Sequence, residues 1–421
     1  MSYKYLPRIA DNVLDVALRT SGAVLIEGPK WCGKTRTAAE RAKSILYMQD
    51  PDYRDSYLKA ADTKPSLLLK GDAPRLIDEW QMAPVLWDAI RFAVDQRQLK
   101  GQFILTGSAV PRDNVVAHTG TGRIVRMRMR PMTLFESKES NGTISLSELF
   151  NGDTDGNCIS TLDIEMLAYA LVRGGWPASI GEAETVGFQR AHDYVDAVIN
   201  ADISEVDGVE KSPTRVRALM RSLARNISTM ASLATIHGDI AGDEESISDK
   251  TISSYLNALR RIFVVEDLPA WSPAMRSKTT IRTSSKRHFC DPSIATAVLR
   301  ATPDNLLQDF NTFGFLFESL CVRDLRVYAQ SLDGEVFHYR DRNGLEADAV
   351  IHLKDGRWGA VEVKMGAKEI ETAARNLKTL RDKINLDKMQ EPAFLMILTA
   401  TGFGYKREDG VYVTPIGCLK N

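Results

Sequence analysis

The first diagnostic segment of the chain reads Val24-Leu25-Ile26-Glu27-Gly28-Pro29-Lys30-Trp31-Cys32-Gly33-Lys34-Thr35. Its apolar start predicts a buried strand, and Gly28 to Thr35 fits the pattern G-x-x-x-x-G-K-[ST] ahead of a predicted helix. In this pattern, backbone N–H groups surround phosphate oxygens, the lysine reaches the terminal phosphates and the hydroxyl holds Mg²⁺. We therefore expect residues 28–35 to bind ATP, with Lys34 acting in catalysis and Thr35 as a magnesium ligand.

Two more apolar runs end in polar residues. One leads into Asp78 and Glu79, and the other leads into Thr106 and Ser108. Such runs fit strands of a parallel sheet, whose carboxyl ends meet at one edge. We expect Asp78 to bind Mg²⁺, Glu79 to activate water as the base, and Thr106 or Ser108 to contact the γ-phosphate or that water. An ordinary capped strand end is the alternative for either hydroxyl.

An arginine-rich segment follows these runs. Arg123, Arg126, Arg128 and Arg130 are separated by apolar residues without any acid, which predicts a strand with one charged face. Arg123 is the candidate for an arginine finger, a cation that stabilises the departing phosphoryl group. For the other three arginines, a solvated face is an equally good interpretation.

These motifs resemble the AAA+-type ATPase domain of a large group of prokaryotic predicted ATPases, which carry a C-terminal domain of unknown function. The resemblance rests on residues 28–35, 76–81, 103–108, 122–123 and 130–136, and it continues through residues 174–177, 222–227 and 289–295. It covers nearly the whole chain and implies a P-loop ATPase with ATP and Mg²⁺ as cofactors.

The composition changes along the chain and predicts an α/β protein with several parts. We expect a P-loop ATPase domain at residues 1–135 and, from a stretch rich in Ser, Asn, Gly and Asp, a linker at 136–160. Residues 161–300 have helical spacing. Residues 301–421 follow the order α-β-β-β-α-β.

The middle part contains two candidate DNA contacts. Residues 228–263 resemble a winged-helix unit, whose second helix can enter the major groove, although such units also serve as packing modules. Residues 271–290 hold five cations and no acid, and can follow a phosphate backbone or form a solvated loop. These cations are Arg276, Lys278, Arg282, Lys286 and Arg287.

The last part contains a possible nuclease site. Asp348 lies in one predicted strand, and Glu362 and Lys364 share a face of the next strand because side chains alternate with period two. Two carboxylates beside a lysine can bind a divalent metal and orient water for phosphodiester cleavage. The pattern resembles the PD-(D/E)XK restriction-endonuclease fold, with Glu318 and Glu346 as auxiliary acids. A salt-bridged sheet edge is the alternative.

Composition excludes several other classes of protein. The chain has 421 residues, with 54 Lys and Arg against 55 Asp and Glu, so neither intrinsic disorder nor a uniformly basic coat is expected. The five cysteines and six histidines lack the spacing of a zinc site. No apolar run approaches the length of a membrane span or signal peptide, so we expect a cytoplasmic protein with no membrane partner.

Two functional hypotheses follow. In the first, Mg²⁺-dependent ATP turnover is coupled to action on DNA through winged-helix and nuclease-like parts. In the second, the chain is an ATP-dependent signalling or toxin-antitoxin-like switch, whose C-terminal domain is a non-catalytic platform for another protein. Either can involve a homo-oligomer. Arg123 would then act on a neighbouring subunit, although it could equally act within its own chain or not at all.

Overall fold

The computed structural model describes residues 5–109, 121–206, 208–241, 248–273, 284–384 and 389–421. The chain forms two compact units. The N-terminal unit comprises residues 1–131, 201–210 and 258–264, and the C-terminal unit comprises residues 132–200, 211–257 and 265–421. Most of the predicted part 161–300 therefore lies in one unit with residues 301–421, whereas residues 201–210 and 258–264 belong to the N-terminal unit.

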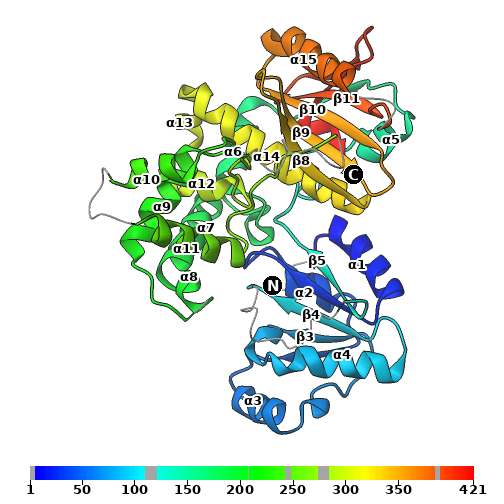
Figure 1. Cartoon of the computed structure of the whole chain (residues 1–421), viewed down its shortest axis with the longest axis vertical. Coiled ribbons are helices and arrows are strands. Elements are labelled where there is room, and N and C mark those ends of the chain that lie inside the picture. Colours follow the sequence, from blue (N-terminus) through cyan, green and yellow to red (C-terminus); the bar gives the residue numbers. More distant parts are fainter. Residues whose placement is uncertain (1–4, 110–120, 207, 242–247, 274–283, 385–388) are drawn as a thin grey trace. The chain divides into compact units, whose positions relative to one another are not determined.

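A parallel sheet of five strands is the centre of the N-terminal unit (Figure 1). Its order is β2-β3-β4-β1-β5. The bounds are β1 Ala23–Glu27, β2 Ser44–Tyr47, β3 Arg75–Asp78, β4 Phe103–Gly107 and β5 Ile124–Arg128. The parallel sheet expected from the apolar runs is confirmed. Strand β2 was not expected, because it is short and three of its four side chains are at least partly exposed.

Helices cover both faces of this sheet, which is why its central strands β1, β3 and β4 are buried along nearly their whole length. Alternate side chains of β1 point to opposite faces: Val24 and Ile26 join one core, and Ala23 and Leu25 join the other. The first core is closed by α1 (Ile9–Thr20) and α2 (Lys34–Ala39). The second is closed by α3 (Arg54–Thr63) and α4 (Val85–Arg97).

The middle of the chain is helical, as predicted. Its helices are α6 Ile164–Arg173, α7 Glu184–Ala197, α8 Ile203–Glu205, α9 Pro213–Arg225, α10 Leu233–Ala241, α11 Asp249–Arg261, α12 Pro292–Leu299 and α13 Pro303–Gln308, with a π-helical turn at Val198–Asp202. Helices α10 and α11 lie where a helix-turn-helix was expected. In the described part of residues 228–290, strand-like pairing is limited to three isolated bridges: Val265–Phe289, Leu268–Lys286 and, to the later strand β8, Ala270–His338. The winged-helix interpretation therefore stays a prediction.

The C-terminal part has the predicted order of elements. Helix α14 (Phe310–Ser331) is followed by β8 (Gly334–Arg340), β9 (Glu346–Leu353), β10 (Trp358–Lys364), α15 (Ile370–Lys383) and β11 (Phe394–Thr399). Strands β8, β9 and β10 are antiparallel neighbours, and β11 runs parallel to β10. The sheet is extended by β12 (Phe403–Lys406), β13 (Tyr412–Pro415) and β7 (Cys158–Ile159).

The predicted linker at 136–160 is a folded part of the C-terminal unit. Strand β6 (Ile144–Ser145) pairs with β14 (Leu419–Lys420), and β7 pairs with β12. Between β6 and β7 in the sequence, α5 (Leu146–Asn151) buries the side chains of Leu146, Leu149 and Phe150. A few closely spaced apolar residues thus outweigh the loop-like composition of this segment. The remaining short elements are 3₁₀ turns at Pro65–Leu67, Trp80–Met82, Pro177–Ser179, Ala367–Glu369 and Ile416–Cys418.

Candidate functional site

The loop at Gly28–Thr35 joins the carboxyl end of β1 to α2 and has the backbone that the motif requires. Gly28, Trp31 and Gly33 all have positive φ, at 158°, 65° and 103°. A Cβ atom on Gly28 would lie 2.1 Å from the carbonyl oxygen of Met129. Glycine at position 28 therefore lets the loop pass close to the segment that follows β5.

Lys34 lies inside the curve of this loop. Its ammonium donates hydrogen bonds to the carbonyl oxygens of Gly28 (2.9 Å) and Pro29 (2.8 Å), and the residue is only 5% exposed. The amino end of α2 follows directly and supplies backbone N–H groups and a positive partial charge. A cation and a helix amino end thus converge on one point, which is the arrangement that a phosphate group needs.

Thr35, Asp78 and Thr106 meet at the carboxyl edge of the sheet. The hydroxyls of Thr35 and Thr106 donate to the same oxygen of Asp78, Oδ1, at 2.7 and 2.6 Å. Asp78 is fully buried, and its other oxygen, Oδ2, has no hydrogen-bond partner among the described residues.

A buried carboxylate oxygen without a partner, beside a threonine hydroxyl, fits the oxygen ligands that Mg²⁺ takes. No cluster of three or more His, Cys, Asp or Glu side chains suited to a metal occurs in the part of the chain that the structure describes.

Glu79 follows Asp78 in the left-handed conformation, with φ of 54°. Its Oε2 accepts hydrogen bonds from the hydroxyl of Ser108 (3.2 Å) and from the amide of Gln81, and its own N–H donates to Thr106 Oγ1 (3.3 Å). A non-glycine residue in this conformation is strained, and such strain is common where a side chain is positioned for function. The structure therefore brings Glu79, Thr106 and Ser108 together and adds Gln81, which the sequence analysis missed.

Arg8 is a second residue that the sequence analysis missed. This buried arginine donates from Nη1 to the carbonyl of Cys32 (2.8 Å) and from Nη2 to the carbonyl of Arg130 (2.8 Å). It joins the phosphate loop to the segment after β5. An arginine directly ahead of α1 has no sequence signature of this role, because both partners are distant backbone carbonyls.

The other side chains of the loop differ in exposure. Lys30 forms an ion pair of 2.6 Å with Asp202, which belongs to the same unit. Trp31 is 50% exposed and Cys32 is fully buried. Thus the backbone of the loop, rather than these three side chains, is arranged around the phosphate position.

Arg123 lies at the opposite edge of the sheet. Its carbonyl accepts a hydrogen bond from Ala23, the first residue of β1, and its guanidinium pairs with Asp95 at 2.7 Å. The length of β1, about 13 Å for five residues, separates this edge from the phosphate loop. Within its own chain Arg123 therefore does not reach the phosphate position, and a role as an arginine finger stays a prediction only for a neighbouring subunit. Arg126 and Arg128 instead pair with Glu27.

The C-terminal unit brings four of the predicted nuclease residues into one buried cluster and adds a fifth. Lys364 lies 2.8 Å from Glu362 and 3.7 Å from Asp348. Lys286 lies 2.7 Å from Glu318 and 3.0 Å from Asp348. Glu346 lies outside this cluster and pairs with Arg340 at 2.9 Å, so it is no auxiliary acid here.

Burial and mutual charge shift the pKa values in this charged cluster. Burial, and then the charge of Asp348, raise the pKa of Glu318 and of Glu362 to about 8. Burial alone would lower the pKa of Lys286, but the carboxylates of Asp348 and Glu318 outweigh it and the pKa is raised. Burial alone would raise the pKa of Asp348, but the two ammonium groups hold it below its usual value.

As it stands, the charged cluster does not fit a divalent metal. One oxygen of Asp348 is 3.0 Å from the Lys286 ammonium, and the other accepts a hydrogen bond of 2.9 Å from the N–H of Val363. The Lys286 ammonium thus occupies the place between Asp348 and Glu318 that a metal would need. Of the other cations predicted to follow a phosphate backbone, Arg287 pairs with Asp267 at 2.9 Å, and Arg276, Lys278 and Arg282 lie outside the described residues.

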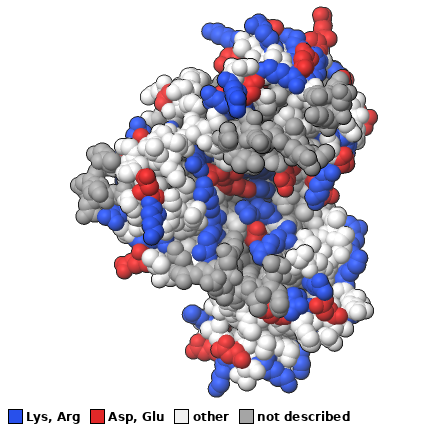
Figure 2. All heavy atoms as spheres, in the orientation of Figure 1, with Lys and Arg blue, Asp and Glu red and all other residues white. Residues whose placement is uncertain are grey.

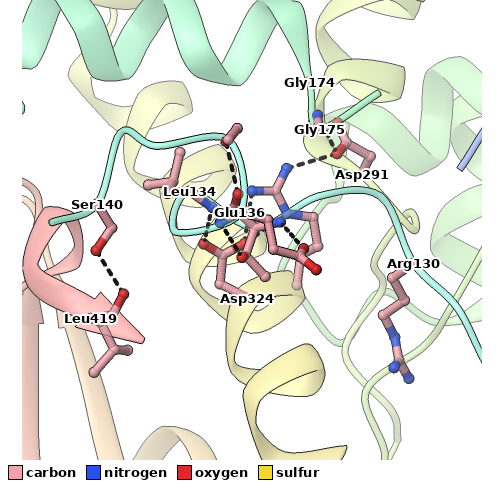
Figure 3. A network of polar contacts seen from close by, with 12 residues as sticks. Arg130, Leu134, Glu136, Ser140, Gly174, Gly175, Asp291, Asp324 and Leu419 are labelled. Carbon is pink, nitrogen blue, oxygen red and sulfur yellow. Dashed lines mark hydrogen bonds and ion pairs between the residues drawn. The ribbon is translucent and has the colours of Figure 1, made fainter. Parts of the chain in front are cut away.

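The motifs that carried the wider resemblance meet in a separate network (Figure 3). The N–H of Leu134 donates to Asp324 on α14 (2.9 Å), and the N–H of Gly175 donates to Asp291 (3.0 Å). Arg323 bridges both carboxylates, at 2.8 Å from Asp291 and 2.7 Å from Asp324. Residues 132–136, 174–177 and 289–295 therefore share a structural role in the C-terminal unit.

Three segments of the chain match models of known domain families. Residues 20–138 match the model of an AAA domain, residues 313–419 match a domain of unknown function, DUF4143, and residues 164–305 match another, DUF8612. Among the helices of the described residues, none is both long and apolar enough to cross a bilayer.

The chain is also similar to individual proteins, two of which are uncharacterized. Uncharacterized protein Mb2031c of Mycobacterium bovis and uncharacterized protein Rv2008c of Mycobacterium tuberculosis are each 23% identical over 353 residues, which is 83% of this chain and 71% of theirs. A Walker-type ATPase of Pyrococcus abyssi has a TM-score of 0.42 at 14% identity, covering 71% of this chain and 97% of that one. A DNA replication initiation factor has a TM-score of 0.28 at 16% identity, covering 60% and 86%. On the family models alone, the chain carries an AAA-type P-loop ATPase domain at residues 20–138, followed further along by a DUF4143 domain at residues 313–419.

Proposed function

We propose that the protein binds Mg²⁺·ATP at Gly28–Thr35 and hydrolyses it. The observation that carries the proposal is the meeting of Thr35, Asp78 and Thr106, which leaves Oδ2 of a buried aspartate without a partner. The site draws on helix α2 and on strands β3 and β4, so a chance match to one loop motif would not produce it.

Each residue has a defined role in this proposal. The N–H groups of residues 28–35 and the Lys34 ammonium hold the β- and γ-phosphates, exchanging the carbonyls of Gly28 and Pro29 for phosphate oxygens. Thr35 and Asp78 hold the Mg²⁺, which neutralises charge on the phosphates. Glu79 accepts the proton of the attacking water, while Ser108 and Gln81 fix its carboxylate.

The proposal also includes coupling between ATP turnover and the C-terminal unit. The backbone of Met129 and Arg130 contacts the phosphate loop through Glu27 and Arg8, and the chain then continues into residues 132–134. There the N–H of Met132 donates to Gly175 (2.6 Å), and the N–H of Leu134 donates to Asp324. A change in the phosphate loop is therefore passed along only a few peptide groups before the chain reaches a rigid, buried network.

The C-terminal unit has two candidate targets in this proposal. The first candidate is DNA, contacted by the winged-helix-like helices and by a nuclease-like domain that uses Asp348, Glu362 and Lys364. The second candidate is a non-catalytic platform for another protein. The contacts of Lys286 favour the platform, because a tethered ammonium already pairs with Asp348 and hydrogen-bonds to Glu318.

ATP hydrolysis with and without single-stranded, duplex and branched DNA tests the main proposal and its DNA part together. We expect Mg²⁺-dependent phosphate release in every case, and stimulation by the form of DNA on which the protein acts. Absence of any hydrolysis would refute the ATPase. If none of the DNA forms changes the rate of hydrolysis, coupling to DNA is refuted. The hypothesis of an ATP-dependent switch then stands.

A DNA-nicking assay with added Mn²⁺ or Mg²⁺ separates the two candidates for the C-terminal unit. If it is a platform, neither the parent nor Asp348→Ala and Glu362→Ala nick DNA with Mn²⁺ or Mg²⁺. If it is a nuclease, the parent nicks DNA and both variants do not. Lys286→Met is compared with the same change combined with Asp348→Ala, and Mn²⁺ binding is measured. Removal of the Lys286 ammonium should allow Mn²⁺ to bind, but only in the protein that keeps Asp348.

A further inference from the structure

Helix α9 borders a hollow of about 640 Å³ within the C-terminal unit. The hollow lies between α9, Ile240 of α10 and the carboxyl end of α12. Its lining is Ser212, Thr214, Arg215, Arg217, Ala218, Arg221, Ile240, Val298, Leu299 and Arg300. Four of these residues are arginines and, among the residues that the structure describes, none of the lining is acidic, so this lining favours an anion.

All the charged side chains of α9 are positive. Its sequence from Pro213 to Arg225 contains four arginines and no Asp or Glu. Arg217 and Arg221 are exposed and four positions apart, so they lie on one face of the helix about 6 Å apart along its axis. In Figure 2, columns of blue side chains cover the part of the surface where Figure 1 labels α9 and its neighbours.

The acidic partner of Arg217 is weakly held. Arg217 lies 2.9 Å from Asp196, but both side chains are more than half exposed. Exposed ion pairs of this kind are worth about 0–1 kcal/mol, so a phosphate can replace the carboxylate. Arg300, at the end of α12, is exposed and adds a cation from a second helix.

The amino end of α9 adds polar groups of the same preference. The helix has 13 residues and begins with Pro213 after Ser212, whose hydroxyl caps the N–H of Arg215 at 3.5 Å. The hydroxyl of Thr214 also lines the hollow. Guanidinium groups, hydroxyls and the positive end of a helix are the groups with which proteins hold phosphodiesters.

We propose that this hollow, with Arg217, Arg221 and Arg300, binds the phosphodiester backbone of a nucleic acid strand. The spacing of Arg217 and Arg221 along the helix lets successive phosphates be contacted, and the apolar floor of Ala218, Val298 and Leu299 packs against sugar carbons. The contacts are to the backbone, so binding is independent of base sequence. The inference deepens the DNA part of the proposed function and does not depend on ATP hydrolysis.

The test is fluorescence anisotropy of the full chain with labelled duplex DNA, single-stranded DNA and RNA of one length, over a range of salt concentrations. The test variant is the triple change Arg217→Ala, Arg221→Ala and Arg300→Ala. The control is Arg19→Ala, Arg54→Ala and Arg375→Ala, which removes the same charge from exposed positions elsewhere. ATP turnover and thermal unfolding are measured for each protein.

We expect the test variant to bind at least about tenfold more weakly and to lose about 0.9 from the salt slope for each phosphate contact removed. The control should bind as the parent does, and all three proteins should hydrolyse ATP alike. Equal weakening in test and control, or no weakening in either, overturns the α9 site. Absence of binding by the parent to all three nucleic acids overturns it as well, while leaving the ATPase proposal intact.

Discussion

The hydroxyl of Thr35 donates a hydrogen bond of 2.7 Å to Oδ1 of Asp78, although the two residues are 43 positions apart. Thr106, from a third strand, donates to the same oxygen. Two hydroxyls thus fix the carboxylate and leave its second oxygen buried and unpartnered. The relationship joins the phosphate loop to the acidic end of β3, and the proposed chemistry depends on it.

Lys34→Ala should abolish measurable ATP turnover, with a loss of at least about 100-fold, because removal of one fixed charge-stabilising group has this scale of effect. Phosphate release is the measurement. Lys70→Ala, at an exposed position away from the loop, is the control and should keep the turnover of the parent. Equal turnover in Lys34→Ala and the parent would contradict the assignment.

Gly28→Ala should destabilise the N-terminal unit by about 1–3 kcal/mol, since the new Cβ would meet the Met129 carbonyl at 2.1 Å and the residue keeps a positive φ. Chemical unfolding monitors the change. Gly366→Ala is the control, because that glycine has open space around it and an extended φ of −152°. A Gly28→Ala protein as stable as Gly366→Ala would show that the close approach is absent.

Arg323→Met should destabilise the C-terminal unit by about 3–5 kcal/mol. Arg323 and its partners Asp291 and Asp324 are buried, with side chains 0–2% exposed, so the variant leaves two buried carboxylates without their cation. Lys354→Met removes an ion pair whose side chains are 77–78% exposed, and should change stability by less than about 1 kcal/mol. Similar effects of the two changes would argue against the network in Figure 3.

The charged cluster of the C-terminal unit predicts a pH dependence of stability. With a folded pKa of about 8 and an unfolded pKa near ~4.3, Glu318 and Glu362 hold protons in the folded chain that the unfolded chain has released. Their contribution to the free energy of unfolding is therefore full at low pH and is lost as the pH rises towards 8.

Glu318→Gln with Glu362→Gln should remove this dependence. Urea unfolding of the parent and the double variant at several pH values between 5 and 8 is the measurement. The difference in stability between the two proteins isolates the glutamates from His338, whose pKa burial lowers to about 4 and whose effect has the opposite sign. A difference that is constant with pH would contradict the raised pKa values.

Local sequence was enough for the elements that carry strong periodicity. Strands β1, β3 and β4, and the order from α14 to β11, follow from apolar runs and alternation, which depend on neighbouring residues alone. Thr35, Asp78, Glu79 and Thr106 were predictable for the same reason, since each one lies at the carboxyl end of a strand or inside a loop motif.

Contacts between distant segments were not predictable. Lys286 is 62 positions from Asp348, and Arg8 is 122 positions from Arg130. Neither lysine nor arginine has a local pattern that names a distant partner. Composition also misled at residues 136–160, where the pairing of Ile144 with Leu419 shows that a polar segment can complete a sheet.

Single-turnover phosphate release from bound ATP tests the central claim most directly, when the parent and Glu79→Gln are compared with Mg²⁺ and with EDTA. The account predicts release by the parent only with Mg²⁺, and a Glu79→Gln protein that retains ATP but releases phosphate about 10²–10⁴-fold more slowly. Release that is insensitive to EDTA, or equally fast in Glu79→Gln, would contradict it.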